Sequence, residues 1–167
     1  MNWKSILIVF ITMSFSACDY YIINPYNEDV GYIYEKDALD DGFKLCYDEK
    51  VFPYYYGRSQ AKFTYGKDSL KQYFLEKYSN YDDTSESGFI TFRFIVNCKG
   101  EAGRFVIHEL GTDFQNKKFN EKIVANLYEH LGKLKDWQPI MYYDDKYDSF
   151  IHITFKIENG ELLEILP

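Results

Sequence analysis

The order of the periodic segments in the chain predicts an α+β fold with two layers. Two segments, 67–79 and 116–134, carry apolar residues at helical spacing. Three more, 88–97, 102–110 and 150–157, alternate apolar and polar residues as half-buried strands do. We therefore expect two helices packed on one antiparallel three-stranded sheet, with further edge strands near the C-terminus as an option.

The first helix is expected over 67–79, followed by a polar loop. Its apolar residues fall four apart on one face: Leu70, Phe74 and Tyr78. Ser69 followed by Gln72 fits a capping box, and Asp68 is the alternative cap.

The segment 88–110 is expected to form a β-hairpin around a turn at 98–101, where Gly100 can adopt a positive φ. One face of its first strand is apolar throughout: Ile90, Phe92, Phe94 and Val96. The core face of the second strand stays open, because both of its faces carry apolar residues: Phe105 and Ile107 on one, Val106 and Leu110 on the other.

The second helix is expected over 116–134, with a stripe formed by Phe119, Ile123, Leu127, Leu131 and Leu134. It ends before Trp137-Gln138-Pro139, because Pro139 cannot continue a helix. After a polar loop at 144–148, the strand 150–157 points four apolar side chains inward: Ile151, Ile153, Phe155 and Ile157. Asn159-Gly160 then predicts a turn into a short last strand at 162–166.

The N-terminus predicts export. Lys4 precedes an apolar run at 6–15 that is too short to span a bilayer as a helix. Small residues then stand before Cys18, which resembles the bacterial lipoprotein signal, in which the cysteine is acylated and 1–17 is removed. An ordinary cleaved signal with an incidental Cys18 is the alternative.

Export gives a role to the two remaining cysteines, Cys46 and Cys98. In an oxidising compartment an even pair predicts a disulfide. It would close a loop of about fifty residues and contribute about 3–4 kcal/mol in the chain-entropy model. Two buried unpaired thiols are the alternative. Their wide spacing, without a Cys-x-x-Cys or histidines at ligand spacing, argues against a zinc site, and we expect no metal or cofactor.

Composition excludes some classes of function. The net charge of −7 gives the chain no electrostatic footprint for nucleic acid, and membrane attachment would rest on acyl chains. The 17 tyrosines and 14 phenylalanines favour a β-rich domain or an aromatic binding surface. We divide the chain into a signal peptide at 1–17, a tether and aromatic-rich arm at 18–64, and a domain at 65–167.

The stretch from Tyr65 to Ile157 resembles the C-terminal domain of TonB, particularly the divergent TonB-like proteins of Bacteroidetes. The resemblance rests on the order and spacing of several features: Tyr65-Gly66 before Leu70, the strand from Gly88 through Phe92, Phe94, Val96 and Asn97, Gly100, the strand Phe105-Val106-Ile107, Trp137-Gln138-Pro139, and the strand Ile151 to Ile157. It covers a little over half of the chain.

The resemblance implies that an extended peptide from an outer-membrane receptor pairs with the last strand of the sheet, which is β-augmentation. On this chain the implied partner-binding edge strand carries Phe150, His152, Thr154 and Lys156. Pairing of 162–166 with that edge would block such docking. The chain departs from TonB because it has a lipid signal in place of a transmembrane anchor and lacks a long proline-rich spacer, so we expect no energy coupling.

No constellation for catalysis stands out. His108, His130 and His152 fall on different elements, and a solvated loop explains Asp144, Asp145 and Asp148 better than a calcium site does. Trp137 is expected as a core anchor, with a partner-facing role as the alternative.

We therefore expect a non-enzymatic protein-interaction module, lipid-anchored in the cell envelope, in the inner or outer membrane, and facing the periplasm. The alternatives are a structural envelope lipoprotein and a carbohydrate-binding lipoprotein that uses the tyrosines at 54–56.

Overall fold

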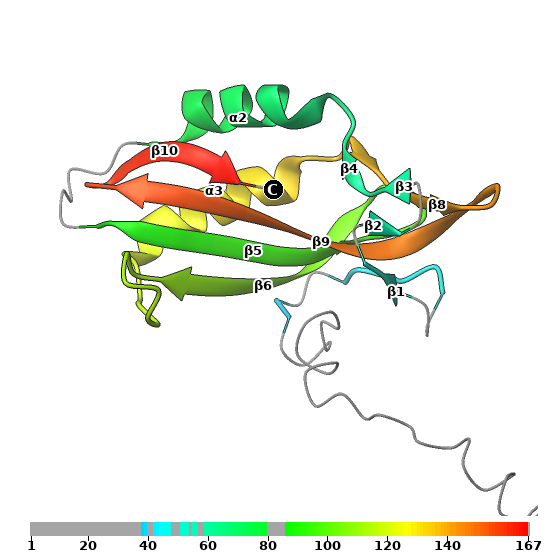
Figure 1. Cartoon of the computed structure of the whole chain (residues 1–167), viewed down its shortest axis with the longest axis horizontal. Coiled ribbons are helices and arrows are strands. Elements are labelled where there is room, and N and C mark those ends of the chain that lie inside the picture. The colour runs from blue at the N-terminus through cyan, green and yellow to red at the C-terminus, as the bar shows by residue number, and fades with distance from the viewer. Residues whose placement is uncertain are drawn as a thin grey trace, which may run out of the picture. The chain divides into compact units, whose positions relative to one another are not determined.

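The computed structural model of the protein describes residues 38–39, 42–47, 51–53, 55–56, 59–79 and 86–166 (Figure 1). The predicted signal peptide and Cys18 lie outside these residues. Among the described residues, no helix is long and apolar enough to cross a membrane.

The described residues form an α+β fold built on one six-stranded sheet. Its strands are β1 (Val51–Phe52), β5 (Gly88–Val96), β6 (Ala102–Leu110), β8 (Ile140–Tyr142), β9 (Asp145–Glu158) and β10 (Glu161–Leu166). The order is β1-β9-β5-β6, and both β8 and β10 also pair with β9. The predicted hairpin β5–β6 and its antiparallel pairing to β9 form the centre of the sheet.

The three-stranded sheet is corrected to six strands. The main reason is β9, which begins at Asp145 inside the predicted polar loop and pairs there with β8. Polar composition suggested a loop, but a hairpin supplies the backbone partners that this stretch needs. The optional C-terminal strand is present as β10, antiparallel to β9, and β1 adds a short parallel pair.

Helices α2 (Gly66–Lys77) and α3 (Glu121–Lys133) pack against the sheet, and α3 lies behind it in Figure 1. The predicted capping box on the first helix is wrong, because Tyr65 occupies the cap position and makes no side-chain cap bond. The second helix starts later than predicted. Asn120 caps it by accepting a hydrogen bond from the backbone N–H of Lys122 at 3.0 Å.

The core lies between the helices and the sheet. Its largest fully buried side chains include the predicted inward residues of β5 and β9 and of both helices: Phe74, Ile90, Phe92, Phe94, Ile123, Leu127, Leu131, Phe155 and Ile157. Burying each contributes about 1.5–3 kcal/mol. The open question on β6 is resolved, since Phe105 is buried and stacks on Phe94 with ring centroids 4.9 Å apart.

Two small sheets fix the segment that precedes α2. Strands β2 (Tyr55–Tyr56) and β3 (Ser59–Gln60) form one, and β4 (Lys62–Phe63) and β7 (Trp137–Gln138) form the other. The hydroxyl of Ser59 also accepts a hydrogen bond from the backbone N–H of Met141 at 2.7 Å. These contacts hold 59–63 against β7 and β8.

Candidate binding site

The side of β9 that faces away from β5 is covered by two strands with a gap between them. β1 pairs with Asp148 and Ser149, and β10 pairs from Thr154 onward. Because β5 also pairs with Ser149 and with Thr154, β1 and β10 both lie on the side of β9 opposite β5. Among the described residues, no strand pairs with Phe150–Ile153 on that side.

The predicted partner-binding edge is therefore corrected for half of its residues. Thr154 pairs with Leu166 and Lys156 pairs with Glu164, so β10 already occupies the edge there. The pairing of β10 with β9 is stabilised because Leu162 and Ile165 are buried in the core. The alternating pattern of 150–157 alone does not reveal this pairing. Phe150 and His152 remain in the gap.

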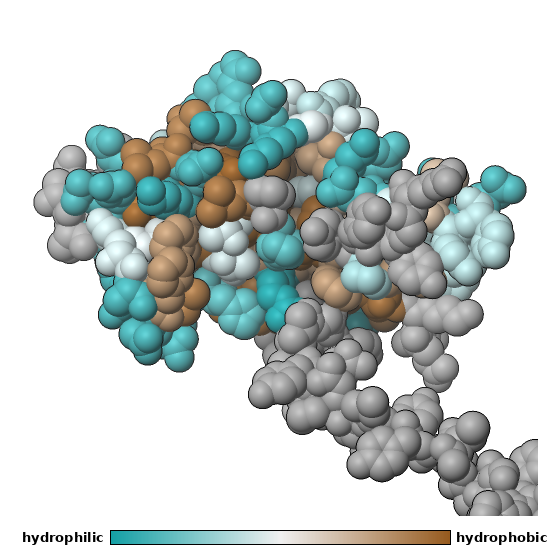
Figure 2. Space-filling view, viewed as in Figure 1, coloured by the Kyte–Doolittle hydropathy of each residue, from teal (hydrophilic) through white to brown (hydrophobic). Residues whose placement is uncertain are grey.

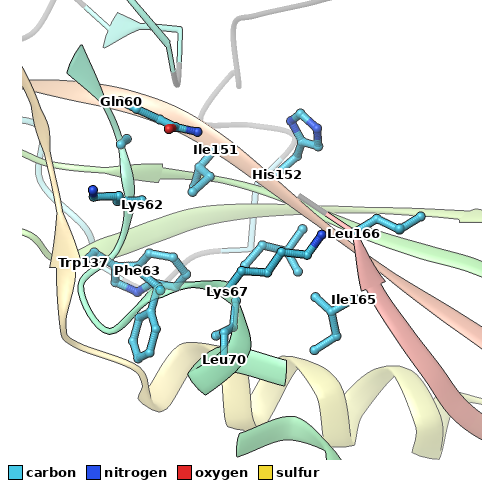
Figure 3. A pocket seen from close by; sticks show the side chains of 13 residues that line it. Gln60, Lys62, Phe63, Lys67, Leu70, Trp137, Ile151, His152, Ile165 and Leu166 are labelled. Carbon is cyan, nitrogen blue, oxygen red and sulfur yellow. The ribbon is translucent and has the colours of Figure 1, made fainter. Parts of the chain in front are cut away.

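A cavity of about 310 Å³ opens beside the gap (Figure 3). The described residues that line it come from the 60–63 segment, the start of α2, β7, β9 and the end of β10: Gln60, Ala61, Lys62, Phe63, Gly66, Lys67, Leu70, Trp137, Ile151, His152, Ile153, Ile165 and Leu166. Most are apolar. The volume lies at the lower end of the range of ligand pockets in proteins.

Trp137 fixes one wall of this cavity. Its ring meets those of Phe63 and Phe94 edge to face, with centroids 5.4 and 5.1 Å apart, and its Nε1–H donates to the carbonyl of Leu134 at 3.2 Å. Register pairs Trp137 with Phe63 across β4 and β7. With 4% of its surface exposed, Trp137 is a core anchor, as predicted, and it also lines the cavity.

Charge at the cavity is positive although the chain is acidic. Lys62 and Lys67 both line it and are exposed, and neither ammonium group has an ion-pair partner among the described residues. Figure 3 shows the Lys67 side chain extending across the cavity toward Leu166. The described lining contains no carboxylate, hydroxyl or thiol side chain. This arrangement suits an apolar group that carries a negative charge.

The opposite edge of the sheet, β6, is contacted by backbone groups at two points, one within the strand and one near its end. The backbone N–H of Leu39 donates to the carbonyl of Phe105 at 3.0 Å, and that of Lys117 donates to the carbonyl of Glu109 at 3.0 Å. Such contacts break up a continuous row of backbone groups and protect a sheet edge from strand addition.

The predicted disulfide is confirmed. Cys46 and Cys98 are bonded, with Cα atoms 6.0 Å apart. Their sulfur atoms and a carboxylate oxygen of Asp148 lie within 4.8 Å of one another, but sulfurs bonded to each other supply no thiolate to a metal.

The prediction for Asp148 is wrong. It was expected in a solvated loop, yet its side chain is fully buried, and its carboxylate accepts three backbone N–H groups. An aspartate before an alternating strand carries no sequence signal for such a role, because its partners lie some fifty and a hundred residues away.

The face of the sheet turned away from α3 carries interleaved polar and apolar side chains rather than a pocket. Polar and apolar side chains interleave across the molecule in Figure 2. Thr91 and Thr154 share a hydrogen bond of 2.8 Å across β5 and β9. Next to Thr91 on β6, partial burial and the charge of Arg93 lower the pKa of His108 below its ordinary value.

A cluster of exposed and half-buried aromatic side chains surrounds the β8–β9 hairpin. The ring of Tyr147 contacts those of Tyr47 and Phe52, with ring centroids 5.0 and 5.1 Å apart. The ring centroids of Tyr142 and Tyr143 lie 4.6 Å apart. Tyr143 is 85% exposed at a φ of 53°, which is uncommon for a residue with a side chain. Of the run predicted to form an aromatic surface, Tyr54 and the side chains at 55–56 lie outside the described residues.

Comparison with known proteins adds no relative. No family model matches the chain, and neither the curated proteins nor the solved structures contain a significant match.

Proposed function

We propose that the protein is a lipid-anchored, periplasm-facing binding module of the cell envelope, without catalytic activity, that docks a short extended peptide in the cavity beside β9. The observation that carries this proposal is the gap of four residues, Phe150–Ile153, between β10 and β1. The lipid anchor rests on the lipoprotein-like signal that ends at Cys18.

Strand geometry supports an extended occupant. Four residues of β9 span about 13 Å, and alternate residues of a strand turn their N–H and C=O groups to the same side. A peptide lying in the gap would find these groups beside an apolar cavity. This is β-augmentation limited to a short window, in which backbone bonds give affinity and the cavity selects a side chain.

The proposal differs from the docking that the TonB resemblance implies. A receptor peptide along the whole of 150–157 would have to displace β10, whose Leu162 and Ile165 are buried. We therefore do not propose receptor engagement of that length, nor energy coupling. Binding rather than catalysis is favoured because the described cavity lining offers no carboxylate, hydroxyl or thiol beside His152.

In-cell crosslinking tests the proposal. A photoreactive p-benzoylphenylalanine is placed at Gln60, which is exposed and lines the cavity, and at Lys122, which is exposed on α3. We expect a crosslink from position 60 alone, mapping to one short segment of one protein. A synthetic peptide of that segment must then bind the purified protein and suppress the crosslink. Equal labelling from both positions, or a peptide that does not bind, contradicts the proposal.

The aromatic cluster at the β8–β9 hairpin supports a second candidate function, binding of neutral glycans. Exposed rings stack on the apolar faces of sugars, and the neighbouring Asp144 and Asp145 are exposed and can accept hydrogen bonds from sugar hydroxyls. Tyr143→Ala should then abolish retention on immobilised envelope polysaccharide, whereas Tyr65→Ala, which removes an exposed ring elsewhere, should not. Equal retention of the two variants argues against this role.

A further inference from the structure

We infer that the cavity beside β9 recognises the free carboxyl end of a peptide whose last side chain is apolar. The inference rests on the proposed peptide-binding function and names the chemistry of the occupant. It follows from the closed ends of the gap, the charge at the rim and the apolar walls.

The closed ends of the gap require a chain terminus or a tight turn. On one side β10 ends at Leu166, opposite Thr154, and on the other β1 ends at Phe52, opposite Ser149. A partner strand advancing by about 3.3 Å per residue would meet the backbone of one of these strands after about four residues. A peptide that ends inside the gap avoids one of these collisions, so its chain has to leave the plane of the sheet only once.

The charge at the rim selects the carboxyl end over the amino end. Lys62 and Lys67 line the cavity without ion-pair partners among the described residues, and no carboxylate is found in the described lining. An α-amino group would be repelled by both ammonium groups, whereas an α-carboxylate can accept charged hydrogen bonds from them. Lys67 extends across the cavity (Figure 3), so it is the better placed of the two.

The walls next to Lys67 provide for an apolar last side chain. Leu70 lies one turn further along α2, and Ile153 and Ile165 face the same cavity from β9 and β10. A side chain that enters this space leaves water for an apolar surface, which favours aliphatic residues. A polar side chain there would lose its hydration without a described hydroxyl or carboxylate to replace it.

Two peptide libraries that differ in one group test the inference. Both are pooled hexapeptides with the last four positions randomised, one ending in a free carboxylate and the other in a carboxamide. Each is passed over the immobilised, detergent-solubilised full-length protein, and retained peptides are sequenced by mass spectrometry. We expect peptides with an aliphatic last residue from the carboxylate library and almost none from the carboxamide library. The best peptide, measured by fluorescence anisotropy, should bind about tenfold or more tightly than its amide.

Variants assign the effect to the cavity. Lys67→Gln should remove most of the preference for the carboxylate. Leu166→Asp, which adds a negative charge where the last residue of β10 lines the cavity, should do the same. Lys77→Gln is the matched control, because it removes an exposed lysine from the last turn of the same helix.

Each outcome decides between the two proposals. Equal retention from both libraries overturns the carboxylate inference and leaves the peptide-binding function standing. Retention from neither library overturns both. Decanoate is tested in parallel as a single acyl chain with a carboxylate. If it binds and no peptide does, the cavity is assigned to an acyl chain, which also overturns both proposals. A carboxylate preference that survives Lys67→Gln and Leu166→Asp would place the carboxylate site outside this cavity and overturn the inference.

Discussion

Asp148 on β9 holds Cys98 in place across the sheet, because its Oδ1 accepts the backbone N–H of Cys98 at 2.8 Å. Its Oδ2 accepts the backbone N–H groups of Cys46 and Tyr47 at 2.7 and 3.0 Å. One buried carboxylate thus positions both halves of the disulfide. The arm at 42–47 is attached to the sheet twice, by a covalent bond and by charged hydrogen bonds.

Replacing Asp148 should be costly. Asp148→Ala leaves three backbone donors without an acceptor, which we expect to lower the free energy of unfolding by about 3–5 kcal/mol. Asp148→Asn keeps one acceptor oxygen and should lose less. Urea unfolding of the oxidised proteins measures both values. A loss below about 1 kcal/mol for the alanine variant would contradict this account.

Removing the disulfide should act mainly through the unfolded chain. The Cys46→Ser/Cys98→Ser variant releases a loop with a sequence separation of 52 residues, and we expect a loss of about 3–4 kcal/mol. Reduction of the wild-type protein with dithiothreitol should give a similar loss, measured by urea unfolding with and without reductant. The double variant itself should not respond to dithiothreitol, which makes it the internal control.

The close packing of the Phe43 ring on Gly103 should leave no room for a methyl group at position 103. A Cβ added at Gly103 would lie 2.3 Å from the Phe43 ring, so Gly103→Ala must displace the ring or the strand. We expect a loss of about 1–3 kcal/mol and faster proteolysis of the arm. Gly132→Ala on α3 is the control, because its Cβ meets nothing within 4 Å; there the same change should stabilise by about 0.5–1 kcal/mol.

His108 should make the protein slightly less stable in acid. Its pKa in the folded protein is lowered by partial burial and then by the charge of Arg93. The unfolded chain therefore binds the proton more readily, so the free energy of unfolding should fall as the pH drops below about 6.5. His108→Gln should flatten this dependence. In an NMR titration, Arg93→Met should raise the pKa of His108, and an unchanged pKa would rule out the proposed charge effect.

The elements with strong local patterns were predictable from sequence. β5, β6 and β10 fall within a residue of the predicted strands, since each alternates or is bounded by a turn signal. The start of α3 was not predictable, because residues before Asn120 have helical spacing but instead pair with β6, as Asn116 does with Leu110. Tertiary pairing outweighed local periodicity there.

The candidate site could be predicted only in part. Phe150 and His152 were expected on an accessible stretch of the last strand, and they lie in the gap. The cavity itself was not expected, because it forms where 60–63, the start of α2 and the end of β10 converge. Lys62 and Lys67 are ordinary surface lysines in the sequence, and only this convergence brings them together.

The disulfide also determines how the domain would bear tension. If Cys18 carries the lipid, a pull from the membrane travels along roughly 28 residues, at most about 100 Å of extended chain, and reaches its first covalent cross-link at Cys46. From there the load passes to Cys98, directly after β5 at the centre of the sheet. The short β1 lies outside this load path, so the gap that it borders on β9 would keep its shape while the anchor is stretched.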